Sequence, residues 1–273
     1  MSTPTTTPTS PATRMLHAVT DSSMMVRRSL IHILRYPAMT VPLVIGPIVF
    51  LLLFVYVFGG TLGAGLGKSG GRGDYVNYVT PGILLLAVAS AATATAVSVC
   101  TDMTEGIVSR FRTMAIFRPS LLTGHVVRSL VQTFISVTAV IGVALLVGFR
   151  PSAGLLGWLG AAGMLALLTL AITWIAVIMG LVSDSVETAS NLPMLLMILP
   201  FFGSGFVPTD SMPAWLGWIA EHQPFTPVME SLRGLLLGTP IGDQAWIAVA
   251  WCAGITVVAF WGAAKLLARE PGR

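Results

Sequence analysis

The sequence predicts an all-α integral membrane protein with six transmembrane helices, and three observations carry that prediction. Lys, Arg, Asp and Glu together make up only 10% of the 273 residues, against about 25% in an ordinary soluble domain. Hydrophobic residues make up 55% of the chain, and the mean hydropathy is +0.84. The apolar residues also fall into six uncharged windows. So few charges cannot cover the surface of a soluble protein of this size, so we expect the chain in a membrane.

Each window is long enough to cross a bilayer as a helix, because about 20 residues at 1.5 Å each cover roughly 30 Å of hydrocarbon. Within one domain of residues 39–267, the predicted spans are 39–58, 81–100, 129–149, 159–182, 188–207 and 246–264. In the fifth span, Pro193, Pro200 and Gly203 predict a kinked or partly unwound helix. No window contains Asp, Glu, Lys, Arg or His, so chemistry within the lipid is not expected.

The distribution of basic residues predicts which ends face the cytoplasm. With the N-terminus inside, the cytoplasmic segments hold 11 of the 15 Lys and Arg residues, and the outside segments hold 4. Cytoplasmic loops of membrane proteins carry the excess of positive charge. We therefore expect a multi-pass protein of the cell membrane with both termini in the cytoplasm. The net charge of +4 is assigned to contact with the bilayer and not to nucleic-acid binding.

The segment before the first span predicts a tail followed by an amphipathic helix. Residues 1–13 are rich in Ser, Thr and Pro, which is typical of a disordered tail. In residues 14–36, every seventh residue is charged, at Arg14, Asp21, Arg28 and Arg35. These residues share one helix face, and the apolar residues lie on the other. We expect this helix in the cytoplasmic membrane interface, with packing on a soluble partner as the alternative.

The second cytoplasmic loop, residues 101–128, has the composition of a docking element. It combines acidic residues with arginines and apolar side chains, as in Asp102, Glu105, Arg110, Phe111 and Arg112. Arginine and aromatic side chains are typical anchors of a short helix that binds another protein. A positively charged cytoplasmic loop with incidental apolar residues is the alternative.

The last outside segment, residues 208–245, is strongly apolar for a loop. Turn residues at Pro213, Pro224 and Gly238 divide it into two short helices. Large side chains such as Trp215 would each lose roughly 1.5–3 kcal/mol of burial in water. We therefore expect two re-entrant helices that dip into the outer leaflet or pack on the spans as a lid. Glu230 and Arg233, three residues apart, are expected to pair.

At these two loops the sequence resembles the permeases of type-2 ABC transporters, nearest to the daunorubicin-resistance type. Those permeases carry an acidic residue, a glycine and Arg-Phe-Arg after the second span, and Asp102, Gly106 and residues 110–112 match this pattern. They also carry a phrase similar to residues 206–216, followed by stretches similar to 224–227 and 233–235. The resemblance covers about residues 14–265. It departs at Ala115, where relatives often have proline.

The resemblance implies the permease subunit of an ATP-driven exporter. The neutral, apolar spans suit a hydrophobic or amphipathic cargo such as a drug, an antibiotic or a lipid, and the resemblance favours an antibiotic. This chain would bind no cofactor, and ATP with Mg would bind to two copies of a partner ATPase. A second permease chain, identical or a sister, would complete the complex in the lipid bilayer. Residues that would couple to the ATPase are Asp102, Glu105, Gly106, Arg110, Phe111, Arg112, Arg28 and Arg35. The lid would comprise Phe206, Pro208, Met212, Pro213, Trp215, Trp218, Phe225, Glu230 and Arg233.

Two other classes of protein stay open from the residues alone. A membrane-embedded lipid-modifying enzyme would need polar catalytic groups at a membrane face, and His125 and His222 are the candidates. A non-transporting membrane scaffold or immunity protein is the second. Two cysteines and four scattered histidines show no metal-ligand spacing, so no metal site is expected.

Overall fold

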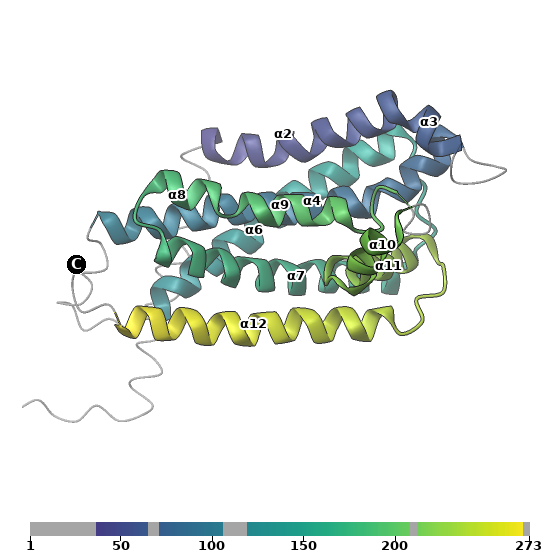
Figure 1. The fold of residues 1–273 in the computed structure, drawn as a ribbon. Coiled ribbons are helices and arrows are strands. Elements are labelled where there is room, and N and C mark those ends of the chain that lie inside the picture. The colour runs from purple at the N-terminus through teal and green to yellow at the C-terminus, as the bar shows by residue number, and fades with distance from the viewer. Residues whose placement is uncertain (1–36, 65–70, 106–118, 208–211, 270–273) are drawn as a thin grey trace, which may run out of the picture.

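The computed structural model describes residues 37–64, 71–105, 119–207 and 212–269, and none of these residues lies in a strand. The tail of residues 1–13 and the predicted amphipathic helix of residues 14–36 lie outside these ranges. The long helices run side by side (Figure 1). In order, the elements are α2 (Pro37–Leu53), the π-helical turn η1 (Phe54–Phe58), α3 (Gly59–Ala64), α4 (Arg72–Thr104), α6 (Pro119–Val147), α7 (Leu155–Val182), α8 (Val186–Asn191), α9 (Met194–Ile198), the 3-10 turn η2 (Leu199–Phe202), α10 (Ala214–His222), α11 (Phe225–Leu237) and α12 (Gln244–Arg269).

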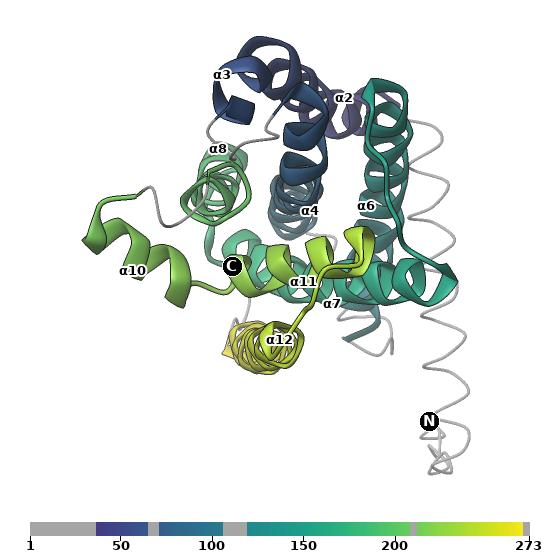
Figure 2. The same cartoon turned by 90° about the vertical axis from the view of Figure 1, so that its right-hand side faces the viewer.

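Five helical stretches of the described ranges are long and apolar enough to cross a membrane, judged by length and composition. They are Val41–Ala64, Arg72–Thr104, Gly124–Val147, Leu155–Val182 and Gln244–Leu266. The most apolar window of α4 is 78% buried, whereas the windows in the first and last of these stretches are 17% and 22% buried. Helix α4 is therefore the centre of the bundle (Figure 2). Helices α2 and α12 leave large apolar side chains exposed, as helices that face lipid do.

Glycines allow the central helix to approach its neighbours closely. A Cβ atom at Gly180 of α7 would lie 2.6 Å from the carbonyl oxygen of Ala96 in α4. A Cβ at Gly82 of α4 would lie 2.9 Å from the carbonyl oxygen of Gly205. Helices in lipid gain little from burying apolar side chains against one another, so close backbone contacts of this kind hold them together.

Most predicted spans are shorter than the helices that contain them. Helix α4 begins at Arg72 rather than at residue 81, since Pro81 lies within the helix without ending it. Helix α6 begins at Pro119 rather than at residue 129, which shortens the predicted loop of residues 101–128 from its C-terminal side. A helix continues as long as its backbone hydrogen bonds continue, and a hydropathy window does not register those bonds.

The longer helices contain ionisable residues that lie outside the predicted span windows. Asp102 lies in the span-length helix Arg72–Thr104, and His125 and Arg128 lie in the span-length helix Gly124–Val147. All three lie toward the ends of these helices. A polar side chain at such a position can reach a partner on the next helix or the membrane surface.

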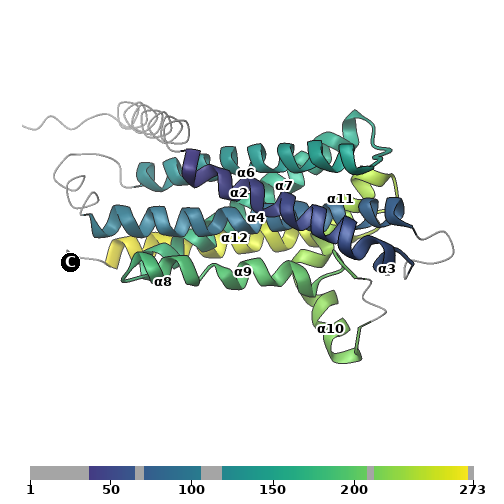
Figure 3. The same cartoon turned by 90° about the horizontal axis from the view of Figure 1, so that it is seen from above.

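The fifth predicted span, residues 188–207, is not a continuous helix. It is divided into α8, α9 and η2, and Pro193 separates the first two. Ser185 caps α8, because its hydroxyl oxygen accepts a hydrogen bond from the Thr188 amide at 3.2 Å. The predicted kink and partial unwinding are therefore confirmed. The three short elements together run beside α4 (Figure 3).

Helices α10 and α11 form the expected pair of short helices before the last span. Helix α11 ends at Gly238, whose φ of 71° is left-handed and whose amide donates to the carbonyl of Gly234. Helix α11 lies across the end of the bundle and contacts α4, α7 and α12, whereas α10 projects to the side (Figures 2 and 3).

Candidate functional site

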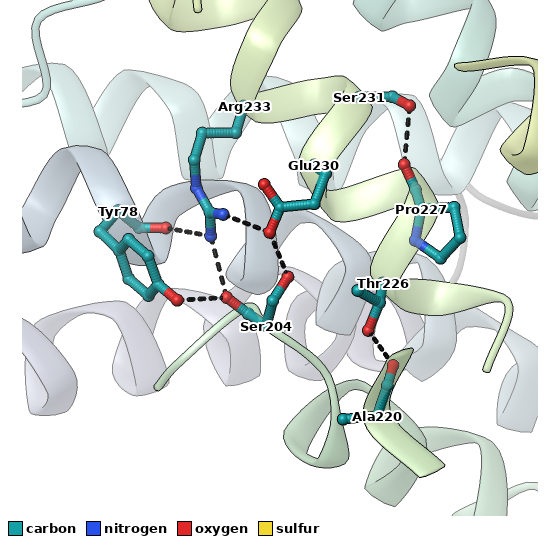
Figure 4. Close-up of polar contacts among 8 residues, drawn as sticks. All are labelled: Tyr78, Ser204, Ala220, Thr226, Pro227, Glu230, Ser231 and Arg233. Carbon is teal, nitrogen blue, oxygen red and sulfur yellow. Dashed lines mark hydrogen bonds and ion pairs between the residues drawn. The ribbon is translucent and has the colours of Figure 1, made fainter. Parts of the chain in front are cut away.

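Four polar residues form a hydrogen-bonded cluster where α11 meets α4 (Figure 4). We call this set the Arg233 cluster, and it consists of Tyr78, Ser204, Glu230 and Arg233. The Arg233 Nη1 donates to Glu230 Oε1 at 2.6 Å, and Nη2 donates to the Ser204 carbonyl oxygen at 2.9 Å. The Ser204 hydroxyl donates to Glu230 Oε1 at 2.6 Å, and the Tyr78 hydroxyl donates to the Ser204 carbonyl at 2.7 Å.

The Arg233 cluster connects three parts of the chain that are distant in sequence. Tyr78 belongs to α4, Ser204 follows η2, and the ion pair belongs to α11. The guanidinium carbon lies 4.1 Å from the centre of the Tyr78 ring, and the Arg233 side chain is only 13% exposed. The expected pairing of Glu230 with Arg233 is present. Sequence reasoning missed Tyr78 and Ser204, because no spacing rule relates residues so far apart in the chain.

The other predicted lid residues divide into buried and exposed groups. Phe206 and Phe225 are 4% and 2% exposed, so they anchor this end of the bundle in its core. Trp215 and Trp218, both on α10, are 67% and 62% exposed. Of the remaining predicted lid residues, Met212 is half-buried, Pro213 is exposed, and Pro208 lies outside the described residues.

A second polar cluster lies at the opposite end of α4. We call it the Asp102 cluster, and it consists of Ser98, Asp102, His125 and Arg128. The His125 Nε2 lies 2.9 Å from Asp102 Oδ2, and the His125 side chain is only 9% exposed. The Arg128 Nη1 donates to the Ser98 hydroxyl oxygen at 3.2 Å. These contacts join the last turns of α4 to α6, near the two ends of the predicted docking loop.

Two of the predicted coupling residues lie in the described ranges, and one of the two belongs to the Asp102 cluster. Asp102 belongs to it, and Glu105 is exposed at the C-terminal end of α4. The other predicted coupling residues lie outside the described ranges, namely Gly106, Arg110, Phe111, Arg112, Arg28 and Arg35. The two histidines proposed for catalysis are both engaged, since His222 contacts the carbonyl and the ring of Trp218.

A periodic signal in the sequence points to the Asp102 cluster, and sequence reasoning did not use it. Polar residues recur along α6 at the spacing of one helix face, at His125, Arg128, Ser129, Gln132, Thr133 and Ser136. Five of these six side chains are buried, and Arg128 is partly buried. The stripe forms specific contacts: the Ser129 hydroxyl lies 2.8 Å from that of Thr173 in α7, and Ser136 donates to the Leu43 carbonyl in α2 at 2.8 Å.

The two clusters are separated by about the thickness of a bilayer. Ser98 follows Tyr78 by twenty positions along α4, which corresponds to about 30 Å of helix. The clusters therefore have the spacing of the two borders of a hydrocarbon core. Within the described residues, no three His, Cys, Asp or Glu side chains gather as a set that could hold a metal ion.

Comparisons with known proteins agree with this membrane architecture. The ABC-2 type transporter family model matches residues 21–237, a range that contains both clusters. The chain is 27% identical over 232 residues to the daunorubicin resistance ABC transporter permease protein DrrB1 of Streptomyces coeruleorubidus, covering 85% of this chain and 80% of that protein. It is 26% identical over 215 residues to the probable doxorubicin resistance ABC transporter permease protein DrrC of Mycobacterium tuberculosis, covering 79% and 78% of the two chains.

Proposed function

We propose a function for this chain from one premise: the chain belongs to the ABC-2 type transporter family. It is a multi-pass membrane protein and the permease subunit of an ABC exporter, and it is not itself an enzyme. The observation that carries this conclusion is the family match over residues 21–237, which includes most of the described helices. ATP hydrolysis belongs to a partner subunit, on which ATP and Mg would bind.

The cargo that we propose is a hydrophobic or amphipathic compound, such as a drug or antibiotic. The names of the two relatives refer to daunorubicin and doxorubicin resistance. The chemistry of the spans supports the same class, because their middle portions are apolar and uncharged. A lipid has the same amphipathic character and remains the alternative cargo.

We propose six membrane crossings, with the broken segment as the fifth. The Cys100 Sγ donates to the Ser183 carbonyl at 3.5 Å, and the Tyr75 hydroxyl donates to the Phe206 carbonyl at 3.4 Å. The segment from Ser183 to Phe206 therefore runs along the part of α4 between Tyr75 and Cys100. These two residues are 25 positions apart, which corresponds to about 37 Å of helix. This length is sufficient for a crossing. An even number of crossings puts both termini on one side, and the excess of basic residues supports the cytoplasm as that side.

We propose that the Asp102 end of the bundle receives the force from the ATPase. The predicted docking loop of residues 101–128 includes Glu105, Arg110 and Phe111. The Asp102–His125 contact ties the helices on both sides of that loop, so a push on the loop would move α4 and α6 together. Two permease chains with two ATPase subunits would make the working complex, with Arg28 and Arg35 beside the docking site.

At the other end, we propose that α10 and α11 form a lid over the exit. The Arg233 cluster links α11 to α4, so a movement of the central helix would reach the lid directly. Trp215 and Trp218 are exposed on α10, and tryptophan is enriched where a membrane meets water. We infer that α10 rests in the border of the outer leaflet.

Alanine substitution in the docking loop tests this function. The permease is co-expressed with its ATPase subunit, and co-purification, ATP turnover and export of a fluorescent anthracycline are measured. Phe111→Ala is expected to reduce the amount of bound ATPase, or the export per ATP, about tenfold, because aromatic anchors carry much of the binding energy of an interface. Phe58→Ala removes a partly exposed phenylalanine near the opposite end of the bundle and serves as the control.

Two different results would contradict the coupling role of the loop and the proposed cargo class. Normal export by the Phe111→Ala complex, with its ATPase still bound, would show that this loop does not couple the subunits. Failure of the unmodified pair to export any amphipathic compound would instead contradict the proposed cargo class.

A further inference from the structure

One arginine lies beside each end of α4, Arg128 from α6 and Arg233 from α11, and the two differ in their partners. Arg233 has a carboxylate, two carbonyl oxygens and an aromatic ring around its guanidinium. Arg128 has one hydrogen bond to the described residues, from its Nη1 to the Ser98 hydroxyl at 3.2 Å. The charge of Arg233 is balanced within the chain, and the charge of Arg128 has no such partner among the described residues.

The carboxylate nearest in position to Arg128 is already engaged. Asp102 Oδ2 lies 2.9 Å from His125 Nε2, and no described carboxylate lies within ion-pair distance of the Arg128 guanidinium. Asp102 still acts on Arg128 through space, but it contributes no direct hydrogen bond. Among the described residues, Ser98 alone accepts from Arg128, so most of the five N–H donors of Arg128 have no acceptor within this part of the chain.

The position of Arg128 favours an anion as that group. Arg128 is partly buried, and it lies beside Ser98, at the border of the predicted hydrocarbon core. A cation near lipid is costly unless an opposite charge accompanies it. The neighbouring face of α4 is also half-exposed, at Thr93, Ala94, Val97 and Thr101, and these side chains are small.

We propose that Arg128 and Ser98 bind the phosphate of an anionic phospholipid at this border of the membrane. The planar guanidinium presents paired N–H groups that match two phosphate oxygens, and the Ser98 hydroxyl lies within reach of the same headgroup. The acyl chains of the lipid lie along the exposed apolar surface of the bundle. This site is separate from the proposed cargo and lid, and it does not depend on transport.

Native mass spectrometry of the purified full-length permease tests the site. The apparent Kd of the first bound phosphatidylglycerol is measured, and diacylglycerol with the same acyl chains is measured beside it. Arg128→Gln is expected to raise the Kd for phosphatidylglycerol about fivefold, the contribution of one basic residue near an anionic membrane surface. The Kd for diacylglycerol is expected to stay unchanged, because that lipid has no phosphate. Arg128→Lys is expected to retain part of the affinity.

Arg150→Gln is the matched control. It removes the same charge from an exposed arginine, whose guanidinium donates, within the described ranges, only to the Leu145 and Phe149 carbonyls. An equal loss of phosphatidylglycerol affinity in this control would show a general charge effect and overturn the site. An unchanged Kd for the Arg128→Gln variant would overturn it as well. Displacement of the lipid by an equal concentration of inorganic phosphate would assign the site to a soluble anion and refute the lipid assignment.

Discussion

Replacing Arg233 with methionine is expected to destabilise the end of the bundle where α11 meets α4. Methionine is an unbranched apolar side chain that replaces the stem of arginine but removes the guanidinium, and with it the charge and every N–H donor. The variant loses the 2.6 Å contact with Glu230, the 2.9 Å contact with the Ser204 carbonyl and the contact with the Tyr78 ring. Glu230 then keeps only the hydrogen bond from the Ser204 hydroxyl.

The size of the effect can be worked out from burial. Removing one partner of a fully buried ion pair costs about 3–5 kcal/mol, because the other charge is left unpaired. The Glu230 side chain is 35% exposed, so water screens its charge and reduces that cost to about 2 kcal/mol. The lost contact with the Tyr78 ring adds about 0.5–1 kcal/mol. A loss of about 2.5–3 kcal/mol lowers the melting temperature of a chain of this size by roughly 5–12 °C.

The two native cysteines provide the assay. Cys100 and Cys252 are free and buried, so a fluorogenic maleimide reports unfolding when heat exposes them. The detergent-purified protein is heated with this dye, and the midpoint is compared between the parent and the Arg233→Met variant. Arg233→Lys, which keeps the charge but not the planar fork, is expected to recover about half of the loss.

Arg150→Met serves as the control, since Arg150 is exposed and its side chain donates to no described group other than the carbonyls of Leu145 and Phe149. Its melting temperature is expected within about 2 °C of the parent. A shift equally small for Arg233→Met would refute the claim that the Arg233 cluster stabilises this end. Equal large shifts in both variants would show a general effect of lost charge.

Two further predictions concern packing and thiol chemistry. A Cβ at Gly82 would lie 2.9 Å from the Gly205 carbonyl oxygen, so Gly82→Ala is expected to cost about 1–3 kcal/mol in the same thermal assay. Gly142→Ala, whose Cβ would meet nothing within 4 Å, is expected to leave the melting temperature unchanged, and equal midpoints for the two variants would argue against the close approach. Cys100 and Cys252 are expected to resist maleimide in the folded protein and to form no disulfide with each other, so rapid modification detected by intact-mass measurement would show that the thiols are accessible.

Local features of this fold were predictable from the sequence. The pairing of Glu230 with Arg233 follows from a separation of three residues on one helix. The interruption of the fifth segment follows from Pro193, and the end of α11 follows from Gly238. Each of these features depends on residues within one or two turns of each other.

Helix ends and the partners of polar residues were harder to predict. Hydropathy placed the start of the third span at residue 129, because His125 and Arg128 counted as loop charges. In the structure both residues belong to α6, and Asp102 supplies the partner for His125 from another helix. His125 is acceptable there because the Asp102 carboxylate lies 2.9 Å from its ring nitrogen, and only the packing of α4 on α6 brings that carboxylate within reach.

Composition and periodicity alone determined that this protein is a helical membrane protein. They also determined where most of its helices lie, because both properties follow from hydropathy and backbone hydrogen bonding within one segment. Tertiary structure decided that α4 is the central helix, that Ser204 and Tyr78 complete the site around Arg233, and that Arg128 lacks such a set of partners among the described residues. Those outcomes depend on how closely separate helices approach one another, and glycines such as Gly82 and Gly180 set that distance.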